Sequence, residues 1–294
     1  MSAGGASARG PRAPAAPRRL VVPAPAKVNL FLHVTGRRAD GYHLLESLFT
    51  LVDLADTLTL ERREDGEVVR TGDVAGVPVD ADLSLRAARR LKEATGCRLG
   101  VAIGIDKAIP TGAGLGGGSS DAASVLLALN RLWGLGLPRA ALVDLAQGLG
   151  ADVPFFVFGE TAVARGIGER LTAMTMPAAH LLLVFPEAHV PTAAIFAAPE
   201  LTRGTPSAKM NVFSESYGRN DLEGAACARH PAVAEALAAL KARSPQARMT
   251  GSGACVFAAF ARESAALEAA GALPAGLRAR VVRTLARHPL VAFA

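Results

Sequence analysis

The stretch Pro110-Thr-Gly-Ala-Gly-Leu-Gly-Gly-Gly-Ser-Ser-Asp121 places five glycines within residues 112–118. Glycine has no Cβ, so the backbone here can adopt positive φ and bring its N–H groups close to another molecule. A flexible linker or an ordinary turn is the alternative, but a turn needs only one or two glycines and the flanking segments are strongly patterned. The stretch therefore predicts a loop that holds a ligand through its backbone.

The elements on either side of this loop favour phosphate as the ligand. Residues 101–109 are typical of a β-strand, and Ser119 or Ser120 is a suitable N-cap for a helix in which Asp121 occupies the first turn. Apolar residues then recur at helical spacing: Ala122, Val125, Leu126, Leu129 and Trp133. Unpaired N–H groups and the helix dipole attract anions at such an N-terminus, so the sequence predicts a phosphate-binding loop.

Two other phosphate-binding loops fit less well. Gly112-x-Gly114-x-x-Gly117 matches the dinucleotide fingerprint of a dehydrogenase, but that fold needs an acidic residue about 20 positions later, and residues 122–143 contain none. A Walker loop is excluded because no Gly-Lys-Ser/Thr follows the glycines. A loop without its own lysine needs positive charge from elsewhere, and the candidates are Lys27, Lys107 and a bound Mg²⁺.

Asp152 and Lys27 are the candidate catalytic pair. Asp152 lies among apolar and small residues after a helix, where an unpaired carboxylate is costly to bury, so we expect a cationic partner for it. A carboxylate and a lysine at a phosphate site can together serve as a base for a hydroxyl nucleophile. The alternatives are that Asp152 caps a helix and that Lys27 faces solvent at a strand edge.

The remaining pattern predicts an α+β fold, in which hairpin strands accompany long helices. Apolar and polar residues alternate through residues 26–34, with Lys27, Asn29 and His33 on one face. Residues 64–66 predict a hairpin turn. We expect further strands at residues 43–52, 57–61, 155–158, 161–165, 180–185 and 277–282, and helices at residues 82–94, 138–149, 220–229 and 232–243.

Bulk composition argues for a packed globular protein outside the membrane. Half of the 294 residues are hydrophobic, and no apolar run approaches the roughly 18 residues of a membrane span. The net charge of +6 owes much to residues 1–19, an Ala/Gly/Pro-rich tail that holds Arg9, Arg12, Arg18 and Arg19 and that we expect to be disordered. Three scattered cysteines indicate reduced core residues and a cytoplasmic location.

Three motifs of the chain resemble those of the GHMP small-molecule kinases. They are Pro25-Ala-Lys-Val-Asn-Leu30, the loop at residues 110–121, and Met249-Thr-Gly-Ser-Gly-Ala254. Asp40-Gly-Tyr-His43 and Gly150-Ala-Asp-Val-Pro154 narrow the resemblance to the branch that acts on a cytidine-diphosphate-linked methylerythritol. The resemblance implies a ribosomal-S5-domain-2-like N-terminal domain (residues 20–168) and a ferredoxin-like C-terminal domain (residues 169–294), with ATP and substrate between them.

The resemblance also implies roles for individual residues. Asp152 would take the proton of a tertiary hydroxyl with Lys27 as its partner, and Asn29 would contact the methylerythritol. Tyr42, His43, Thr192 and Phe196 would surround the cytosine ring. Ser119 or Ser120, of which we favour Ser120, would lie near Mg²⁺. ATP would be held by Lys107, Pro110, Thr111, Gly112, Ala113, Gly114, Leu115, Gly116, Gly117, Gly118, Ser119 and Ser120.

Several alternatives remain open at this stage. Another GHMP kinase, of the homoserine or mevalonate type, is the nearest, and a nucleic-acid-binding module and a dehydrogenase are more distant. The sequence permits a monomer or a homodimer. Two positions depart from the usual family pattern: Ala108 stands where a basic or polar residue is common, and Asp82 stands where Asn is common.

Overall fold

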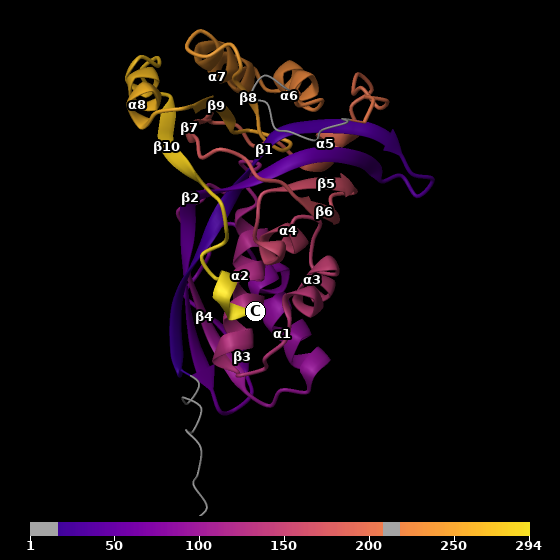
Figure 1. Ribbon diagram of the computed structural model, residues 1–294, viewed down its shortest axis with the longest axis vertical. Helices are drawn as coiled ribbons and strands as arrows, with labels where there is room; N and C mark the ends of the chain where they lie inside the picture. Colours follow the sequence, from indigo (N-terminus) through magenta and orange to yellow (C-terminus); the bar gives the residue numbers. More distant parts are fainter. Residues whose placement is uncertain (1–16, 208–217) are drawn as a thin grey trace, which may run out of the picture.

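The computed structural model describes residues 17–207 and 218–294 as an α+β arrangement, as the sequence predicted (Figure 1). Of the expected tail, residues 1–16 lie outside the described ranges. The strands are β1 (Arg19–Arg37), β2 (His43–Arg63), β3 (Val68–Thr71), β4 (Gly100–Asp106), β5 (Ala162–Gly166), β6 (Arg170–Ala173), β7 (His180–Phe185), β8 (Arg248–Met249), β9 (Val256–Phe260) and β10 (Arg278–Leu285). The helices are α1 (Leu83–Thr95), α2 (Gly117–Leu132), α3 (Arg139–Gln147), α4 (Val153–Phe158), α5 (Thr192–Phe196), α6 (Glu223–Arg229), α7 (Pro231–Lys241) and α8 (Glu263–Gly271), with short 3₁₀ turns at Val79–Ala81 and Val291–Phe293.

Strand β2 connects the two halves of the molecule. It pairs with β1 along nearly its whole length, and its other edge pairs in turn with β5, β10 and β4. The result is one continuous ten-stranded sheet that runs through both halves. Helices α1 to α4 lie against the lower half in Figure 1, and α6 to α8 lie against the upper half.

The C-terminal half has the β-α-β-β-α-β order of a ferredoxin-like fold. Its strands lie in the order β10-β7-β9-β8 and are antiparallel throughout. Strand β7 is followed by helices, β8 and β9 form a hairpin, and α8 leads to β10. The ferredoxin-like arrangement expected for this half is therefore present.

Three apolar clusters make up the core. One joins α1, α2 and α4 to the lower half of the sheet, and a second lies between the upper half of the sheet and its helices. The third lies where the halves meet, and it includes Ile109, Ala113 and Leu115 beside Leu181 and Phe257. The apolar side chains Ala113 and Leu115 of the glycine loop are thus buried against the sheet, which leaves the loop's backbone on the opposite side.

Helix α1 follows its sequence signals closely. The Asp82 side chain accepts a hydrogen bond from the Ser84 N–H at 2.9 Å, and Gly96 ends the helix with φ of 65°. The helix after the glycine loop differs from prediction. It begins at Gly117 with Gly116 as its N-cap at φ of 73°, so neither Ser119 nor Ser120 caps it. Glycine also suits an N-cap, which is why the serine signal misplaced this boundary.

Four other predictions are wrong. Residues 155–158 form helix α4, not a strand, because Pro154 lies in its first turn and Gly159 ends it with φ of 78°. Strand β2 is a single strand over the residues predicted as two, and no hairpin forms at residues 64–66, since β3 pairs with β4 in parallel. Bulges in β1 break the expected alternation after Pro25 and after Asn29.

No helix in the two described ranges is both long and apolar enough to cross a bilayer.

The chain ends against the lower half, where Asn130 donates to the Phe293 carbonyl at 2.8 Å. The backbone N–H of His288 donates to the Gly159 carbonyl at 2.8 Å. The last residues therefore fasten the C-terminal half to helices α2 and α4.

Candidate active site

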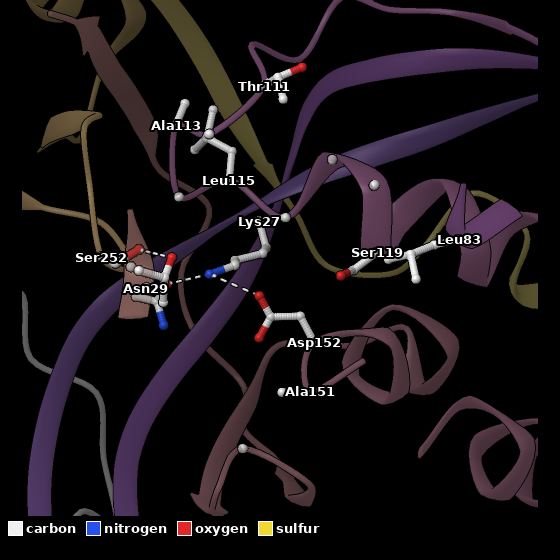
Figure 2. Close-up of a pocket in the computed structure, with 18 of the residues that line it drawn as sticks. Lys27, Asn29, Leu83, Thr111, Ala113, Leu115, Ser119, Ala151, Asp152 and Ser252 are labelled. Atoms are coloured by element: carbon white, nitrogen blue, oxygen red, sulfur yellow. Dashed lines mark hydrogen bonds and ion pairs between the residues drawn. The ribbon is translucent and has the colours of Figure 1, made fainter. Parts of the chain in front are cut away.

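A cavity of about 940 Å³ lies between the two halves, and the three sequence motifs meet in its wall (Figure 2). Most of the residues singled out from sequence line it: Lys27, Asn29, Tyr42, His43, Lys107, Pro110, Thr111, Gly112, Ala113, Gly114, Leu115, Gly116, Gly117, Gly118, Ser119, Asp152, Thr192 and Phe196. Ser120 is not among them. Its side chain is fully buried, and its hydroxyl donates to the Pro25 carbonyl at 2.7 Å.

The glycine loop is shaped by close backbone contacts. Gly112, Gly114 and Gly116 all have φ between 73° and 75°. A Cβ on Gly114 would lie 2.5 Å from the Thr250 carbonyl oxygen, whereas a Cβ on Gly118 would have no protein atom within 4 Å. The loop is thus pressed against the third motif on one side and open on the other, where the first N–H groups of α2 lack helical partners.

Lys27 and Asp152 meet at the centre of the cavity. The Lys27 Nζ lies 3.4 Å from Asp152 Oδ2, and the side chains are 5% and 32% exposed, respectively. Lys27 is therefore not a solvent-facing edge residue. Asp152 occupies the N-cap position of α4, but its side chain makes no capping hydrogen bond. Both alternatives left open by the sequence are excluded, and the expected ion pair is present.

Asn29 holds the Lys27 ammonium from the other side. Lys27 Nζ donates to Asn29 Oδ1 at 2.6 Å, and Asn29 Nδ2 donates to Ser47 Oγ at 2.8 Å. The backbone N–H of Asn29 donates to Thr250 Oγ1 at 2.8 Å, which ties the first motif to the third. The ammonium also lies 5.2 Å from the centre of the Phe49 ring. Lys27 is consequently fixed in one orientation.

Lys107, the other lysine near the loop, is held between two carboxylates. Its Nζ donates to Asp56 and, at 2.7 Å, to Asp121. Burial alone would lower the pKa of Lys107, but the two carboxylates outweigh it and raise that pKa. For the carboxylate the effect of burial has the opposite sign, and it raises the pKa of Asp121. Sequence reasoning did not find Asp56, because only the fold brings it beside the loop.

Aromatic side chains gather at one end of the cavity. The His43 and Phe196 rings lie with their centroids 5.1 Å apart, and Tyr42 next to them is 61% exposed. Thr192 Oγ1 lies 2.7 Å from Ser252 Oγ. Burial, and then Arg203 and Arg37, lower the pKa of His43, so its ring is neutral near pH 7. Sequence reasoning did not find Arg203, which donates a hydrogen bond to His43 Nε2.

The opposite end of the cavity was not assigned from sequence. Apolar side chains including Val77, Leu83 and Ile105 line it beside Asp82. The Asp82 carboxylate, which departs from the usual Asn, accepts from the Arg70 guanidinium at 3.1 Å. Both side chains are almost fully buried, so the carboxylate introduced at this position has a matching cation.

Comparison with known proteins agrees with this architecture. Two family models match, that for the GHMP kinases N terminal domain over residues 82–160 and that for GHMP kinases, C terminal, over residues 197–279. A 4-diphosphocytidyl-2-C-methyl-D-erythritol kinase from Cupriavidus metallidurans is 53% identical over 277 residues, which cover 92% of this chain and 95% of that protein.

Solved structures give the same result. A crystal structure of 4-(cytidine 5'-diphospho)-2C-methyl-D-erythritol kinase superposes with a TM-score of 0.79 at 39% identity, covering 90% of this chain and 99% of that one. A homoserine kinase from Cytophaga hutchinsonii has a TM-score of 0.68 at 18% identity over 95% of this chain and 98% of its own, a likeness that shows the fold alone. The chain has the two-domain GHMP kinase fold and belongs to the 4-diphosphocytidyl-2-C-methyl-D-erythritol kinase family.

Proposed function

We propose that the protein transfers the γ-phosphoryl group of ATP to the 2-hydroxyl of 4-diphosphocytidyl-2-C-methyl-D-erythritol, a step of the non-mevalonate route to isoprenoid precursors. Membership of this kinase family supports the reaction. The observation that carries the mechanism is the Lys27–Asp152 ion pair, because it lies in the same cavity as the glycine loop and the aromatic end. Both substrates can therefore meet at one carboxylate.

The glycine loop is proposed to hold the triphosphate. Its open side offers the unpartnered N–H groups at the start of α2 and is free of side-chain bulk at Gly118. Lys107 lies close to the loop, since a Cβ placed on Gly117 would be 3.3 Å from the Lys107 Nζ. We assign to Lys107 the support of the loop, since its charge is shared with Asp56 and Asp121.

Mg²⁺ is proposed to accompany ATP. No group of three or more His, Cys, Asp or Glu side chains able to hold a metal occurs within the described parts of the chain. Mg²⁺ keeps several waters and takes most of its other ligands from phosphates, so one hydroxyl from the protein is compatible with it. Ser119 faces the cavity, whereas Ser120 is occupied by Pro25, so Ser119 replaces Ser120 as the residue that would hold the ion. Bound Mg²⁺ would neutralise charge on the transferring phosphates.

Asp152 is proposed as the base that accepts the proton of the 2-hydroxyl. One carboxylate oxygen faces Lys27 and the other is directed away from it (Figure 2). Lys27 holds the carboxylate in place and provides positive charge where the nucleophile and the phosphoryl group meet. Asn29 keeps Lys27 in position and lies within reach of the methylerythritol part of the substrate.

The aromatic end is proposed to bind cytosine. Tyr42 is exposed and Phe196 packs beside His43, so a planar base can stack there and hydrogen-bond to the His43 ring or to Thr192. Homoserine and mevalonate carry no base, so this end favours the cytidylated substrate over either of them. Outside residues 1–19 the net charge of the protein is small, so its attraction for the phosphates of a nucleic acid is weak. We therefore expect no RNA binding.

The test is an ADP-release assay with a substrate panel. Purified enzyme, ATP and Mg²⁺ are incubated with 4-diphosphocytidyl-2-C-methyl-D-erythritol, homoserine or mevalonate at equal concentrations. We expect turnover with the cytidylated substrate only. Turnover with homoserine or mevalonate alone would overturn the proposed substrate.

We further propose that the enzyme is cytoplasmic, since its three cysteines are unpaired. We also propose that its two domains comprise residues 20–168 and 169–294.

A further inference from the structure

Arg203 connects the two rings at the aromatic end of the cavity. Its Nε–H donates to His43 Nε2 at 3.1 Å. Its other nitrogens donate to the carbonyls of Phe196 at 3.1 Å, Ala198 at 2.7 Å and Leu201 at 3.2 Å. The planar guanidinium thus spans from the end of α5 to the start of β2 and fixes His43 relative to Phe196.

The partners of Arg203 in the described ranges are all uncharged groups. Within residues 17–207 and 218–294, no carboxylate forms an ion pair with Arg203. The side chain is half-buried, and each of its described bonds goes to a carbonyl oxygen or to the imidazole. Arg203 therefore orients neighbouring groups through hydrogen bonds and does not neutralise a carboxylate at this site.

The bond to His43 determines where the imidazole carries its proton. An arginine can only donate, so His43 Nε2 must supply a lone pair. Burial and the charges of Arg203 and Arg37 lower the pKa of His43, and a neutral ring has one N–H. That N–H is consequently on Nδ1, which has no hydrogen-bond partner among the described residues.

We propose that Arg203 is a positioning residue that holds His43 as the Nδ1–H tautomer, and that this tautomer selects cytosine over uracil. The inference rests on the proposed function, in which the His43 ring meets the base. Cytosine N3 is an acceptor and pairs with an N–H donor, whereas uracil carries a hydrogen on N3 and would oppose it. With the proton on Nε2 instead, the bare Nδ1 would accept from uracil, so the position of one proton decides which base is bound.

The tautomer is measured first, on the protein without substrate. The ¹⁵N shifts of the His43 ring distinguish a protonated Nδ1 from a protonated Nε2. We expect Nδ1–H in the wild type and Nε2–H, or a mixture, in Arg203→Met. Nε2–H in the wild type, or an unchanged tautomer in the variant, would overturn the proposal. This measurement does not depend on the reaction that the enzyme catalyses, so it separates the proposal from the proposed function.

The specificity is measured next, with the substrate and its uridine-diphosphate counterpart. Arg203→Met should raise the KM for the cytidylated substrate about tenfold with kcat within about twofold, and should reduce the preference for cytosine by about tenfold. Arg229→Met is the matched control. Arg229 forms an ion pair with Glu200, which lies in the same segment as Arg203, and it does not contact His43. A preference that stays unchanged in Arg203→Met, or falls equally in Arg229→Met, would overturn the proposal.

Substitutions of His43 test the same idea if Arg203→Met does not fold. The amide nitrogen of Asn can stand where Nδ1 stands, whereas that of Gln stands nearer to Nε2. His43→Asn should keep the cytosine preference within about threefold, and His43→Gln should lose about tenfold. An equal loss in both variants, or a greater loss in His43→Asn, would show that the donor at Nδ1 does not carry the selection.

Discussion

The ammonium of Lys27 lies 3.4 Å from the carboxylate of Asp152, although one comes from the first strand and the other from the start of α4. The distance is that of an ion pair rather than of a short hydrogen bond. Catalytic contacts are often longer before the substrate binds and tighten with it. The pair is thus held together by the fold, with Asn29 and Phe49 on the lysine and the cavity open to the carboxylate.

Removing the charge of Asp152 should abolish most turnover without disturbing ATP binding. Asp152→Asn keeps the size of the side chain but cannot accept the hydroxyl proton, so kcat should fall by about 10³-fold or more while the KM for ATP stays within about threefold. The readout is steady-state ADP release. Asp144→Asn, at an exposed position on α3, is the control. Near-full activity of Asp152→Asn would show that Asp152 is not the base.

Lys27 and Asp152 should act as one unit in a double-mutant cycle. Lys27→Met should lower kcat about 10²-fold or more, because the carboxylate loses the cation that positions it. The double variant Lys27→Met/Asp152→Asn should be about as slow as the slower single variant, since each change removes the same interaction. Losses in kcat that simply multiply would mean that the two residues act independently.

The fold was predictable where local signals agree with the packing. Helix α1 spans Leu83–Thr95, within one residue of the predicted 82–94 at each end, and Asp82 and Gly96 cap it locally. Residues 155–158 misled because a short run made only of apolar residues has no periodicity by which a strand differs from a helix. The bulges in β1 could not be predicted, since they depend on how β1 pairs with β2.

The site was predictable to the extent that its residues stand in motifs. Lys27, Asn29 and Asp152 are in quoted motifs, and the structure brings them together. The residues that support them are set by tertiary contacts alone: Ser47 behind Asn29 and Asp56 behind Lys107 come from β2. No spacing in the sequence relates the members of these pairs. The supporting residues Ser47 and Asp56 could therefore be identified only from the structure.

The open space beside Gly118 should belong to the nucleotide and not to the protein. A Cβ there meets no protein atom within 4 Å, and φ is not positive. Gly118→Ala should therefore leave the free energy of unfolding within about 0.5 kcal/mol of wild type. It should raise the KM for ATP severalfold, because the methyl group enters the space assigned to phosphates. An unchanged KM would show that the phosphates lie elsewhere.

Gly114→Ala is the matched contrast within the same loop. Here φ is 75° and the added Cβ would lie 2.5 Å from the Thr250 carbonyl oxygen. The loop must shift away from the third motif, so we expect a loss of about 1–3 kcal/mol in the free energy of unfolding together with weaker ATP binding. Urea titration and ADP release measure the two effects. Wild-type stability in Gly114→Ala would contradict the contact on which this prediction depends.

His288 should make the protein sensitive to mild acid. Its side chain is 1% exposed, and burial together with Arg139 lowers the pKa of its ring to about 3. The ring is neutral in the folded state, where Nδ1 accepts from the Leu290 N–H at 3.1 Å. Below the ordinary value of 6.5 the unfolded chain binds a proton here that the folded chain does not. The free energy of unfolding should therefore fall by about 1.4 kcal/mol per pH unit as the pH drops from 6.5 toward 3.

The substitution His288→Asn isolates this contribution. Its amide oxygen can accept the Leu290 N–H in place of Nδ1, but the side chain does not titrate, so the variant should lose less stability than wild type between pH 7 and pH 5. Urea unfolding at several pH values gives the difference, which cancels the titration of groups common to both proteins. His189→Asn, which replaces an exposed histidine, is the control and should follow wild type. Parallel stability curves for wild type and His288→Asn would mean that this buried ring is protonated in the folded protein after all, and that the contact between the C-terminal residues and α4 is open to water.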